Sequence, residues 1–241
     1  MELKFKITLN KILQYWKGVK QMNKFIMSYS CGKDSTLALY RMINKGNIPV
    51  ALITTINKYK KKSCFHGVSV NLIYEISKSL DIPVVLIEVA GNDYTEKFTQ
   101  ALIYIKEKFG ADSCAFGDID LKEHRKWCTS RCDEANIKAI FPLWEEDREE
   151  LVYEFIDSGF KTIIKNVKLQ CMGEEFLGKI LTKDVVKDIK ETGSDACGEN
   201  GEYHTFVYDG PLFKYPINFK ILNVIKNETH GFLEIEEIVH E

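Results

Sequence analysis

Short apolar runs alternate with amphipathic stretches between Asn23 and Phe141. The apolar runs are typical of buried strands and span residues 25–27, 49–56, 82–89, 113–116 and 138–141. In the stretches between them, apolar residues recur at helical spacing, as at Val68, Leu72 and Ile76, which predicts helices packed by one face. Strands and helices alternating at this length favour an α/β fold with a doubly wound parallel sheet.

The pattern changes after Pro142. A helix is expected at 147–157 and a strand at 161–167, followed by glycine-bearing loops. Residues 217–239 alternate apolar and polar positions around a turn at 227–231, which predicts a β-hairpin. We therefore expect one domain at 22–143 and a second, smaller α+β domain at 144–241.

Residues 1–21 form an N-terminal extension with five lysines and one glutamate. Ile12, Trp16 and Val19 fall at helical spacing, so the extension is expected to be either helical or disordered. A membrane-surface helix, an extra packed helix, and a start codon placed too early, with Met22 as the true start, all remain open.

Composition and net charge limit the classes of partner and the cellular compartment that we expect. The net charge of −2 gives no reason to expect a nucleic acid as the main partner. The seven cysteines include no Cys-x-x-Cys pair, which indicates a reducing compartment rather than a disulfide framework or a zinc ribbon. Neither a membrane-length apolar run nor a signal peptide is present in the sequence. We expect a cytoplasmic protein without a membrane partner.

The segment Ser30–Ser35 stands between a predicted strand and a predicted helix. The first turn of a helix exposes unpaired N–H groups that favour an anion, and Lys33 adds a cation. Hydroxyl groups at Ser30, Ser35 and Thr36 add donors, which together predict a phosphate-binding loop. The segment lacks the glycine and the Ser or Thr of a Walker A loop. A plain strand-to-helix turn capped by Ser30 or Asp34 is the alternative.

Residues 30–35 resemble the pyrophosphatase loop Ser-Gly-Gly-x-Asp-Ser of the N-type ATP pyrophosphatases, in the adenine nucleotide alpha-hydrolase-like superfamily. Further segments resemble the diphthine–ammonia ligase family within it. They are His66-Gly67, residues 117–120 with His124-Arg125, residues 142–144, residues 176–178 and, most specifically, Cys197-Gly-Glu-Asn-Gly-Glu-Tyr-His-Thr205 with Asp209-Gly-Pro211. The resemblance runs from about Asn23 to Phe213.

Cys31 departs from the family pattern, which has glycine there. The cysteine is then either a tolerated small side chain, a strained residue if the position needs a positive φ, or a reactive thiol with a lowered pKa.

The resemblance implies an ATP-dependent ligase that adenylates a carboxylate, releases AMP and pyrophosphate, and aminates the acyl group with ammonia. It implies ATP, with Mg²⁺, as cofactor and a carboxylate acceptor as partner, one candidate being the modified histidine of elongation factor 2. Two alternatives are a tRNA-modifying sulfur transferase that uses Cys31 or Cys197, and a non-catalytic nucleotide sensor.

The resemblance also assigns residues to roles. Catalytic candidates are Lys33, Asp34, Glu199 and Glu202. The ATP-binding set is Ser30, Cys31, Gly32, Lys33, Asp34, Ser35, Thr36, His66, Gly117 and Asp118. The acceptor-binding set, in the second domain, is Gly198, Glu199, Gly201, Glu202, Tyr203, His204 and Thr205. A solvated glycine-rich turn is the alternative for this last set, and a backbone-bonded loop histidine is the alternative for His66.

No metal site belonging to the protein alone is expected. His124, Cys128 and Cys132 share one face of a predicted helix, but three ligands along a straight helix rarely converge on one ion.

Overall fold

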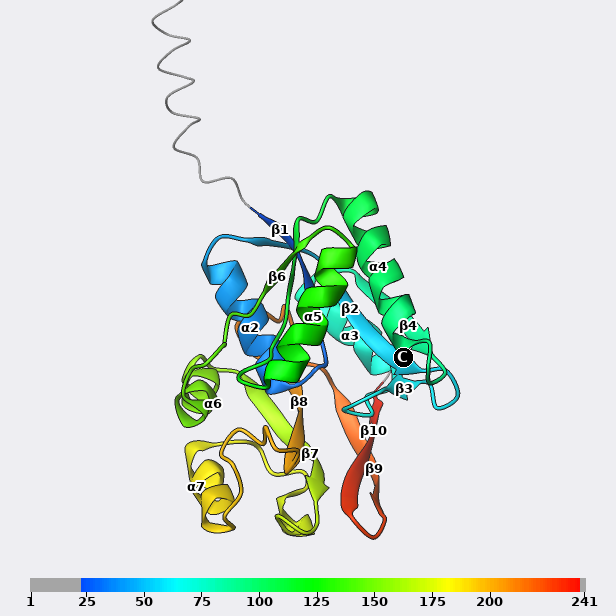
Figure 1. The fold of residues 1–241 in the computed structure, drawn as a ribbon. Coiled ribbons are helices and arrows are strands. Elements are labelled where there is room, and N and C mark those ends of the chain that lie inside the picture. Colours follow the sequence, from blue (N-terminus) through cyan, green and yellow to red (C-terminus); the bar gives the residue numbers. More distant parts are fainter. Residues whose placement is uncertain (1–22, 239–241) are drawn as a thin grey trace, which may run out of the picture.

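The larger of two sheets carries the parallel strands that the sequence predicts (Figure 1). In the computed structural model, which describes residues 23–238, the parallel strands run in the order β4-β2-β1-β5-β6. They are β1 (Lys24–Ser28), β2 (Ile48–Asn57), β4 (Val84–Val89), β5 (Ser113–Ala115) and β6 (Lys138–Ile140). A short strand, β3 (Lys62–Ser63), turns back antiparallel on the end of β2. The predicted α/β class is confirmed.

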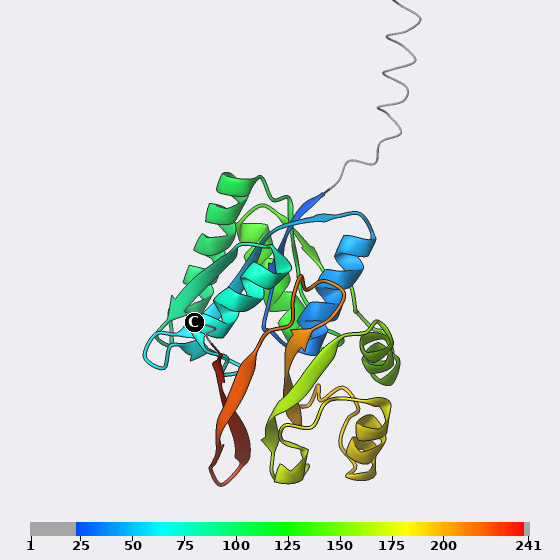
Figure 2. The ribbon, with the colours of Figure 1, turned by 180° about the vertical axis from the view of Figure 1, so that it is seen from behind.

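Helices cover both faces of this sheet. Helices α2 (Lys33–Asn44) and α3 (Val70–Leu80) lie in front of the strands in Figure 2, and α4 (Tyr94–Phe109) and α5 (Lys122–Glu134) lie behind them. Strand β1 shows why both faces are covered. Phe25 and Met27 pack into the core under α2 and α3, whereas Ile26, between them, packs into the core under α4 and α5. The middle of the strand, residues 25–27, is therefore apolar at three successive positions, as is typical of parallel sheets covered on both faces.

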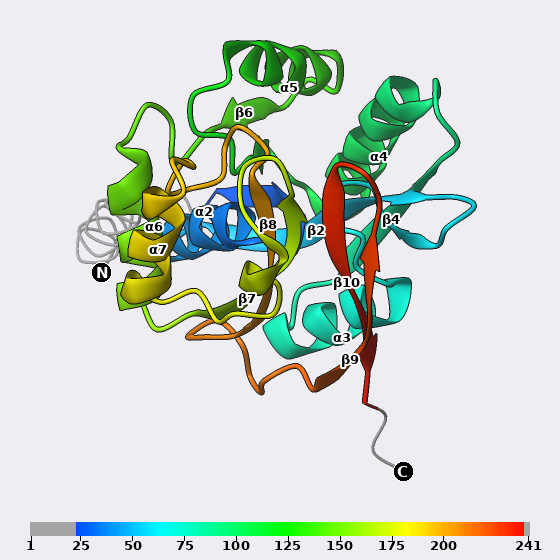
Figure 3. The same cartoon turned by 90° about the horizontal axis from the view of Figure 1, so that it is seen from below.

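A second, antiparallel sheet lies below the first (Figures 1 and 3). Its strands, in the order β8-β7-β10-β9, are β7 (Lys161–Lys168), β8 (Tyr203–Asp209), β9 (Phe219–Lys226) and β10 (His230–Glu237). Strands β9 and β10 pair as the predicted hairpin. Helices α6 (Arg148–Asp157) and α7 (Lys183–Glu191) and the short 3-10 helix η1 (Glu174–Phe176) complete this part.

Two of these elements depart from the sequence prediction. The stretch after β7 was expected to be loop, yet it contains α7, which begins at a Thr182 side chain that accepts a hydrogen bond from the Val185 N–H. The specific motif was expected to be a turn, yet its end forms β8, which pairs with β7.

The two sheets share one hydrophobic core. Phe155 of α6 and Ile164 of β7 belong to the same buried cluster as Leu37 of α2 and Leu72 of α3. The backbone N–H of Val207 in β8 also donates to the carbonyl of Cys31, at 2.9 Å. The second sheet is therefore fixed against the loop that follows β1. Between residues 23 and 238, no helix has the length and apolar character needed to span a membrane.

Candidate active site

The loop after β1 meets the end of β5 at the edge of the sheet where the strand order reverses, which is the usual ligand position in such folds. Gly117, just after β5, makes this contact possible. A Cβ atom at Gly117 would lie 2.8 Å from the backbone nitrogen of Ser35 and 2.9 Å from the carbonyl carbon of Asp34. Gly117 therefore admits the N-terminus of α2, and a cavity of about 530 Å³ opens beside it.

The hydroxyl groups of the loop divide into two kinds. Ser30 and Ser35 line the cavity, and their Oγ atoms lie 3.1 Å apart. Thr36 is fully buried, and its Oγ1 donates to the carbonyl of Gly32 at 2.8 Å and contacts the Tyr29 hydroxyl at 3.0 Å. We correct the expectation for Thr36: its side chain closes the first helical turn and does not line the cavity.

Cys31 adopts a left-handed backbone with φ 68° and is fully buried. A non-glycine residue in this region costs about 1–3 kcal/mol, which explains why the family pattern has glycine here. Burial raises the pKa of the Cys31 thiol. The thiol is outside the cavity lining, so the interpretation as a reactive thiol with a lowered pKa is corrected to that of a strained core residue.

Lys33 and Asp34 form an ion pair at the floor of the cavity. The Lys33 ammonium lies 2.9 and 2.8 Å from the two carboxylate oxygens of Asp34 and 5.4 Å from the centre of the Tyr203 ring. Burial alone would lower the pKa of Lys33, but Asp34 and the other acidic groups around it outweigh burial and raise it. Lys33 therefore presents a permanent positive charge to the cavity.

His66 packs against the phosphate loop. A Cβ atom at Gly32 would lie 2.4 Å from Cε1 of His66, so glycine is needed at this point of contact. The Nδ1 atom of His66 lies 2.8 Å from the carbonyl oxygen of Thr205, and its ring centre lies 4.8 Å from that of His204. Burial and the neighbouring His204 lower the pKa of His66 to about 3. The pair is therefore neutral at physiological pH, and His66 is bonded to backbone while also lining the cavity.

The segment 195–202 forms the opposite wall. The Asp195 carboxylate accepts hydrogen bonds from the backbone N–H groups of Cys197 and Glu199. The Glu202 carboxylate accepts from the N–H of Asp195 and from the N–H and side-chain amide of Asn200. Glu202 is 5% exposed and outside the cavity lining. The expectation of a catalytic Glu202 is therefore corrected: this carboxylate holds the loop that presents Glu199.

Other members of the predicted acceptor set lie on the same wall: Gly198, Gly201, Tyr203, His204 and Thr205 line the cavity with Glu199. Thr205 differs from the others because its hydroxyl already accepts the Lys33 N–H at 3.0 Å.

Two carboxyl groups in the cavity hold protons unusually well. Burial, followed by repulsion from Asp34, raises the pKa of Glu199 to about 7. Burial also raises the pKa of Asp118, although His124, 3.3 Å away, partly offsets it. A carboxyl group that titrates near neutral pH can both accept and return a proton, as acid–base catalysis requires.

Several residues that shape the site were missed from the sequence. Arg148 of α6 donates to Asp120 at 2.8 Å and to Asp195 at 2.9 Å, so it ties the end of the first sheet to segment 195–202. Asp195 lies two positions before Cys197 in the sequence, but a local pattern does not reveal its partner.

Three potential metal-ligand atoms lie within 4.8 Å of one another in the cavity, one each from Asp34, Cys197 and Glu199.

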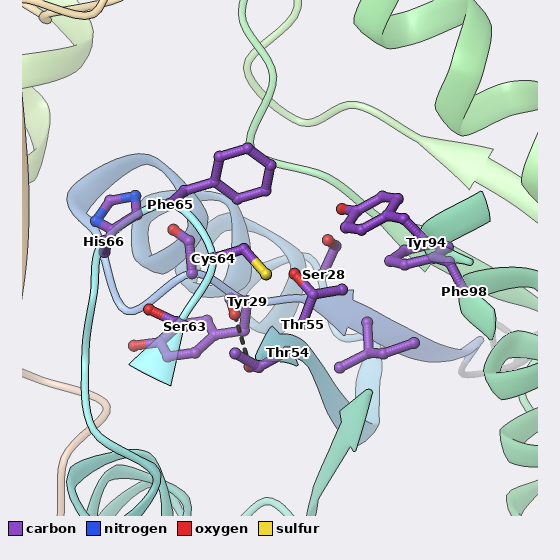
Figure 4. A pocket seen from close by; sticks show the side chains of 12 residues that line it. Ser28, Tyr29, Thr54, Thr55, Ser63, Cys64, Phe65, His66, Tyr94 and Phe98 are labelled. Atoms are coloured by element: carbon purple, nitrogen blue, oxygen red, sulfur yellow. Dashed lines mark hydrogen bonds between the residues drawn. The ribbon is translucent and has the colours of Figure 1, made fainter. Parts of the chain in front are cut away.

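A small recess of about 60 Å³ opens from the cavity between the ends of β1 and β2 (Figure 4). Phe65 and Tyr94 border both the recess and the cavity. Its floor includes Thr54, whose hydroxyl donates to the carbonyl of Tyr29 at 2.7 Å. The Phe65 and Tyr94 rings at its mouth suit the stacking of an aromatic base, which is itself larger than the recess.

The helix face with two cysteines and a histidine directs these side chains to different surroundings. His124 pairs with Asp118, whereas Cys132 is fully buried in the core. The neighbouring Arg125 lies over the Trp144 ring, 4.4 Å from its centre, and outside the cavity lining.

Comparison with known proteins agrees with the motifs on these two walls. The diphthamide synthase N-terminal domain matches residues 23–139, and the diphthamide synthase C-terminal domain matches residues 147–240. The chain belongs to the diphthine–ammonia ligase family. Both walls of the cavity fall within the matched ranges.

Individual family members are distant in sequence. The diphthine–ammonia ligase of Bos taurus is 30% identical over 164 residues, which are 66% of this chain and 60% of that protein. The one from Danio rerio is 27% identical over 235 residues, which are 86% of this chain and 90% of that protein. This chain thus spans about 60% of the bovine relative. A predicted subunit of tRNA methyltransferase from Methanocaldococcus jannaschii has 19% identity and a TM-score of 0.40, over 81% of this chain and all of that one.

Proposed function

We propose that this member of the family is an ATP-dependent amide ligase: it adenylates a carboxylate, releases pyrophosphate, and aminates the acyl group with ammonia. The observation that carries the proposal is one cavity with two unlike walls. One wall is a helix N-terminus with Lys33, and the other presents Glu199, with a pKa of about 7. The first suits phosphates, and the second suits proton transfer during amination.

The different chemistry of the two ends of the cavity favours one orientation of the nucleotide. The β- and γ-phosphates lie on Ser30, Ser35 and the first-turn N–H groups of α2, next to the Lys33 ammonium. The base then reaches the recess bordered by Phe65 and Tyr94. This places the α-phosphate beside segment 198–201, where the acceptor carboxylate enters.

The chemistry follows from this arrangement. An oxygen of the acceptor carboxylate attacks the α-phosphorus, and the bond to the pyrophosphate oxygen breaks. The charge that develops on pyrophosphate is stabilised by Lys33, which is already in position. Ammonia then attacks the acyl carbon and AMP leaves, while the Glu199 carboxylate takes the proton from the nitrogen.

Magnesium would enter with ATP and neutralise its phosphate charge. The Asp34 carboxylate offers the oxygen ligands that Mg²⁺ prefers, whereas the nearby Cys197 thiol does not. Asp34 would hold the ion, which leaves the Glu199 carboxyl free for proton transfer.

A sulfur transferase is less well supported. Burial raises the pKa of the thiols of Cys31 and Cys197, whereas a sulfur carrier needs an accessible thiolate.

The acceptor is proposed to be borne on protein, with the modified histidine of elongation factor 2 as the candidate. The test incubates the chain with labelled ATP, ammonia and the acceptor protein, and measures AMP, pyrophosphate and the acceptor mass. AMP and pyrophosphate in equal amounts, with an acid-to-amide mass change in the acceptor, are expected. ATP binding without any pyrophosphate release would instead indicate a nucleotide sensor.

A further inference from the structure

Lys165 of β7 is a buried lysine without a counter-ion. Its side chain is 3% exposed, and among residues 23–238 no carboxylate or other acceptor pairs with its ammonium. Burial, together with the charge of Lys62, lowers the pKa of Lys165 to about 8. A buried unpaired cation costs free energy, so a ligand that supplies a negative charge would relieve a penalty in the free protein.

A β-bulge places Lys165 in this position. Ile164 pairs with Thr205 and Asn166 pairs with His204, so Lys165 is the extra residue on β7. Bulges of this kind redirect a side chain and are frequent beside active sites. The Lys165 ammonium would lie 3.4 Å from a Cβ atom at Gly67, next to the histidine pair of the catalytic cavity.

Lys165 opens into a second cavity of about 480 Å³, between the β2–β3 loop and the β9–β10 hairpin. Lys60 and Lys62 also line it, whereas Glu234 is the one carboxylate that lines it within the described part of the chain and is bound to Lys62 at 2.8 Å. A second buried polar group in this cavity is a hydrogen-bond acceptor without a donor among the described residues. The side-chain oxygen of Asn166 is buried and accepts no hydrogen bond, and Asn166 is 4% exposed.

The second cavity adjoins the active site. Ser63, Cys64 and Phe65 line both this cavity and the recess assigned to the base. Phe65 is 63% exposed and stands between them. A polypeptide whose acceptor group lies in the active site can therefore pass over Phe65 into the second cavity.

We propose that the cavity around Lys165 and Asn166 binds an acidic segment of the polypeptide that carries the acceptor group. A carboxylate side chain pairs with Lys165, and a peptide N–H donates to Asn166. The apolar walls formed by Ile225, Phe232 and Leu233 favour a peptide over RNA, because sugar and phosphate make no use of them. The inference rests on the proposed function in one respect, that the acceptor is borne on protein.

The test is an NMR titration of the full chain, with the amide signals of Gly67 and Asn166 as reporters. The probe is a blocked tetraglutamate peptide, and blocked tetraglutamine, tetrauridylate and inorganic phosphate are titrated in parallel. We expect saturable shifts with tetraglutamate alone. The Lys165→Met variant should weaken this binding at least about tenfold, equivalent to 1.4 kcal/mol. Lys168→Met, three positions along the same strand and outside the cavity lining, is the matched control and should bind normally.

A stability measurement separates binding from folding. Lys165→Met removes a buried unpaired charge and should unfold at a higher temperature than the parent; Lys165→Gln serves as the second variant if the methionine form does not fold. Equal tetraglutamate affinity in the parent and the Lys165 variant would overturn the proposal, as would shifts caused only by tetrauridylate or phosphate. Binding that persists in a chain without pyrophosphate release would refute the ligase function and leave the docking site standing.

Discussion

The Thr205 hydroxyl accepts a hydrogen bond from the backbone N–H of Lys33 at 3.0 Å, across 172 positions of sequence. Two residues further along β8, the Val207 N–H donates to the carbonyl of Cys31 at 2.9 Å. Strand β8, whose first three residues are also the last three of the motif at 197–205, therefore holds the loop that follows β1 at two points. The two walls of the cavity are therefore fixed relative to each other, which favours the alignment that the proposed acyl transfer requires.

Replacing Thr205 by valine keeps the shape of the side chain and removes this acceptor. The buried Lys33 N–H then loses its partner, which should lower the free energy of unfolding by about 1–3 kcal/mol and weaken ATP binding. Denaturant unfolding and calorimetric ATP titration measure the two effects. Thr205→Ser retains the hydroxyl and should stay close to the parent. If the valine variant binds ATP as tightly as the parent, the bond does not organise the loop.

Replacing Lys33 by alanine removes the cation that faces the leaving pyrophosphate. Loss of one preorganised group that stabilises developing charge lowers turnover by about 10²–10³-fold, and pyrophosphate release should fall by at least this factor. Lys45→Ala, at the exposed end of the same helix, controls for general charge effects and should be fully active. Normal turnover in Lys33→Ala would place the reaction elsewhere in the molecule.

The parallel sheet could be predicted because its signals are local. Each parallel strand contains a short, mostly apolar run, and helices such as α3 and α4 repeat an apolar face. Strand β8 could not be recognised in the same way, since glycines and polar residues precede it and its pairing with β7 is set only in the folded chain. Helix α7 has two buried residues, Val186 and Ile189, too few for a clear pattern.

Residues of the candidate site could be predicted where they belong to a sequence motif. The role of a residue could not be predicted where it depends on whether the side chain is buried. Glu199 and Glu202 stand three positions apart in one motif and look equivalent in the sequence. Folding turns Glu199 toward the cavity and Glu202 into its own loop. Arg148 could not be found at all, because its contacts with Asp120 and Asp195 join three separate segments.

Replacing Glu202 by alanine tests this division of roles. The resemblance assigned Glu202 to catalysis and acceptor binding, whereas the structure gives the Glu202 carboxylate three hydrogen bonds within segment 195–202. We expect the free energy of unfolding to fall by about 1–3 kcal/mol, since a buried donor is left without a partner. Glu202→Gln, which keeps one acceptor oxygen, should lie between. Thermal unfolding of both variants decides the matter, and an alanine variant as stable as the parent would argue against a structural role.

Replacing Glu199 by glutamine tests proton transfer through its pH dependence. With a pKa of about 7, Glu199 is mostly protonated at pH 6 and mostly ionised at pH 8, so amide formation should rise over this interval. The rate must be compared at a constant concentration of free ammonia, because ammonia also titrates. The glutamine variant should be slow and should lack this rise. A rise of the same size in Glu199→Gln would assign the titrating group to another residue.

Stability provides an independent check on Glu199. The pKa is raised in the folded state, so the folded protein holds a proton that the unfolded chain has already lost between about pH 4.5 and pH 7. The stability that this carboxyl contributes is therefore full below that interval and is lost as the pH rises through it. Glu199→Gln cannot ionise, so its stability relative to the parent should improve from pH 4 to pH 8 in denaturant unfolding. A difference between the two proteins that does not change with pH would mean that Glu199 has an ordinary pKa and is not the proton acceptor.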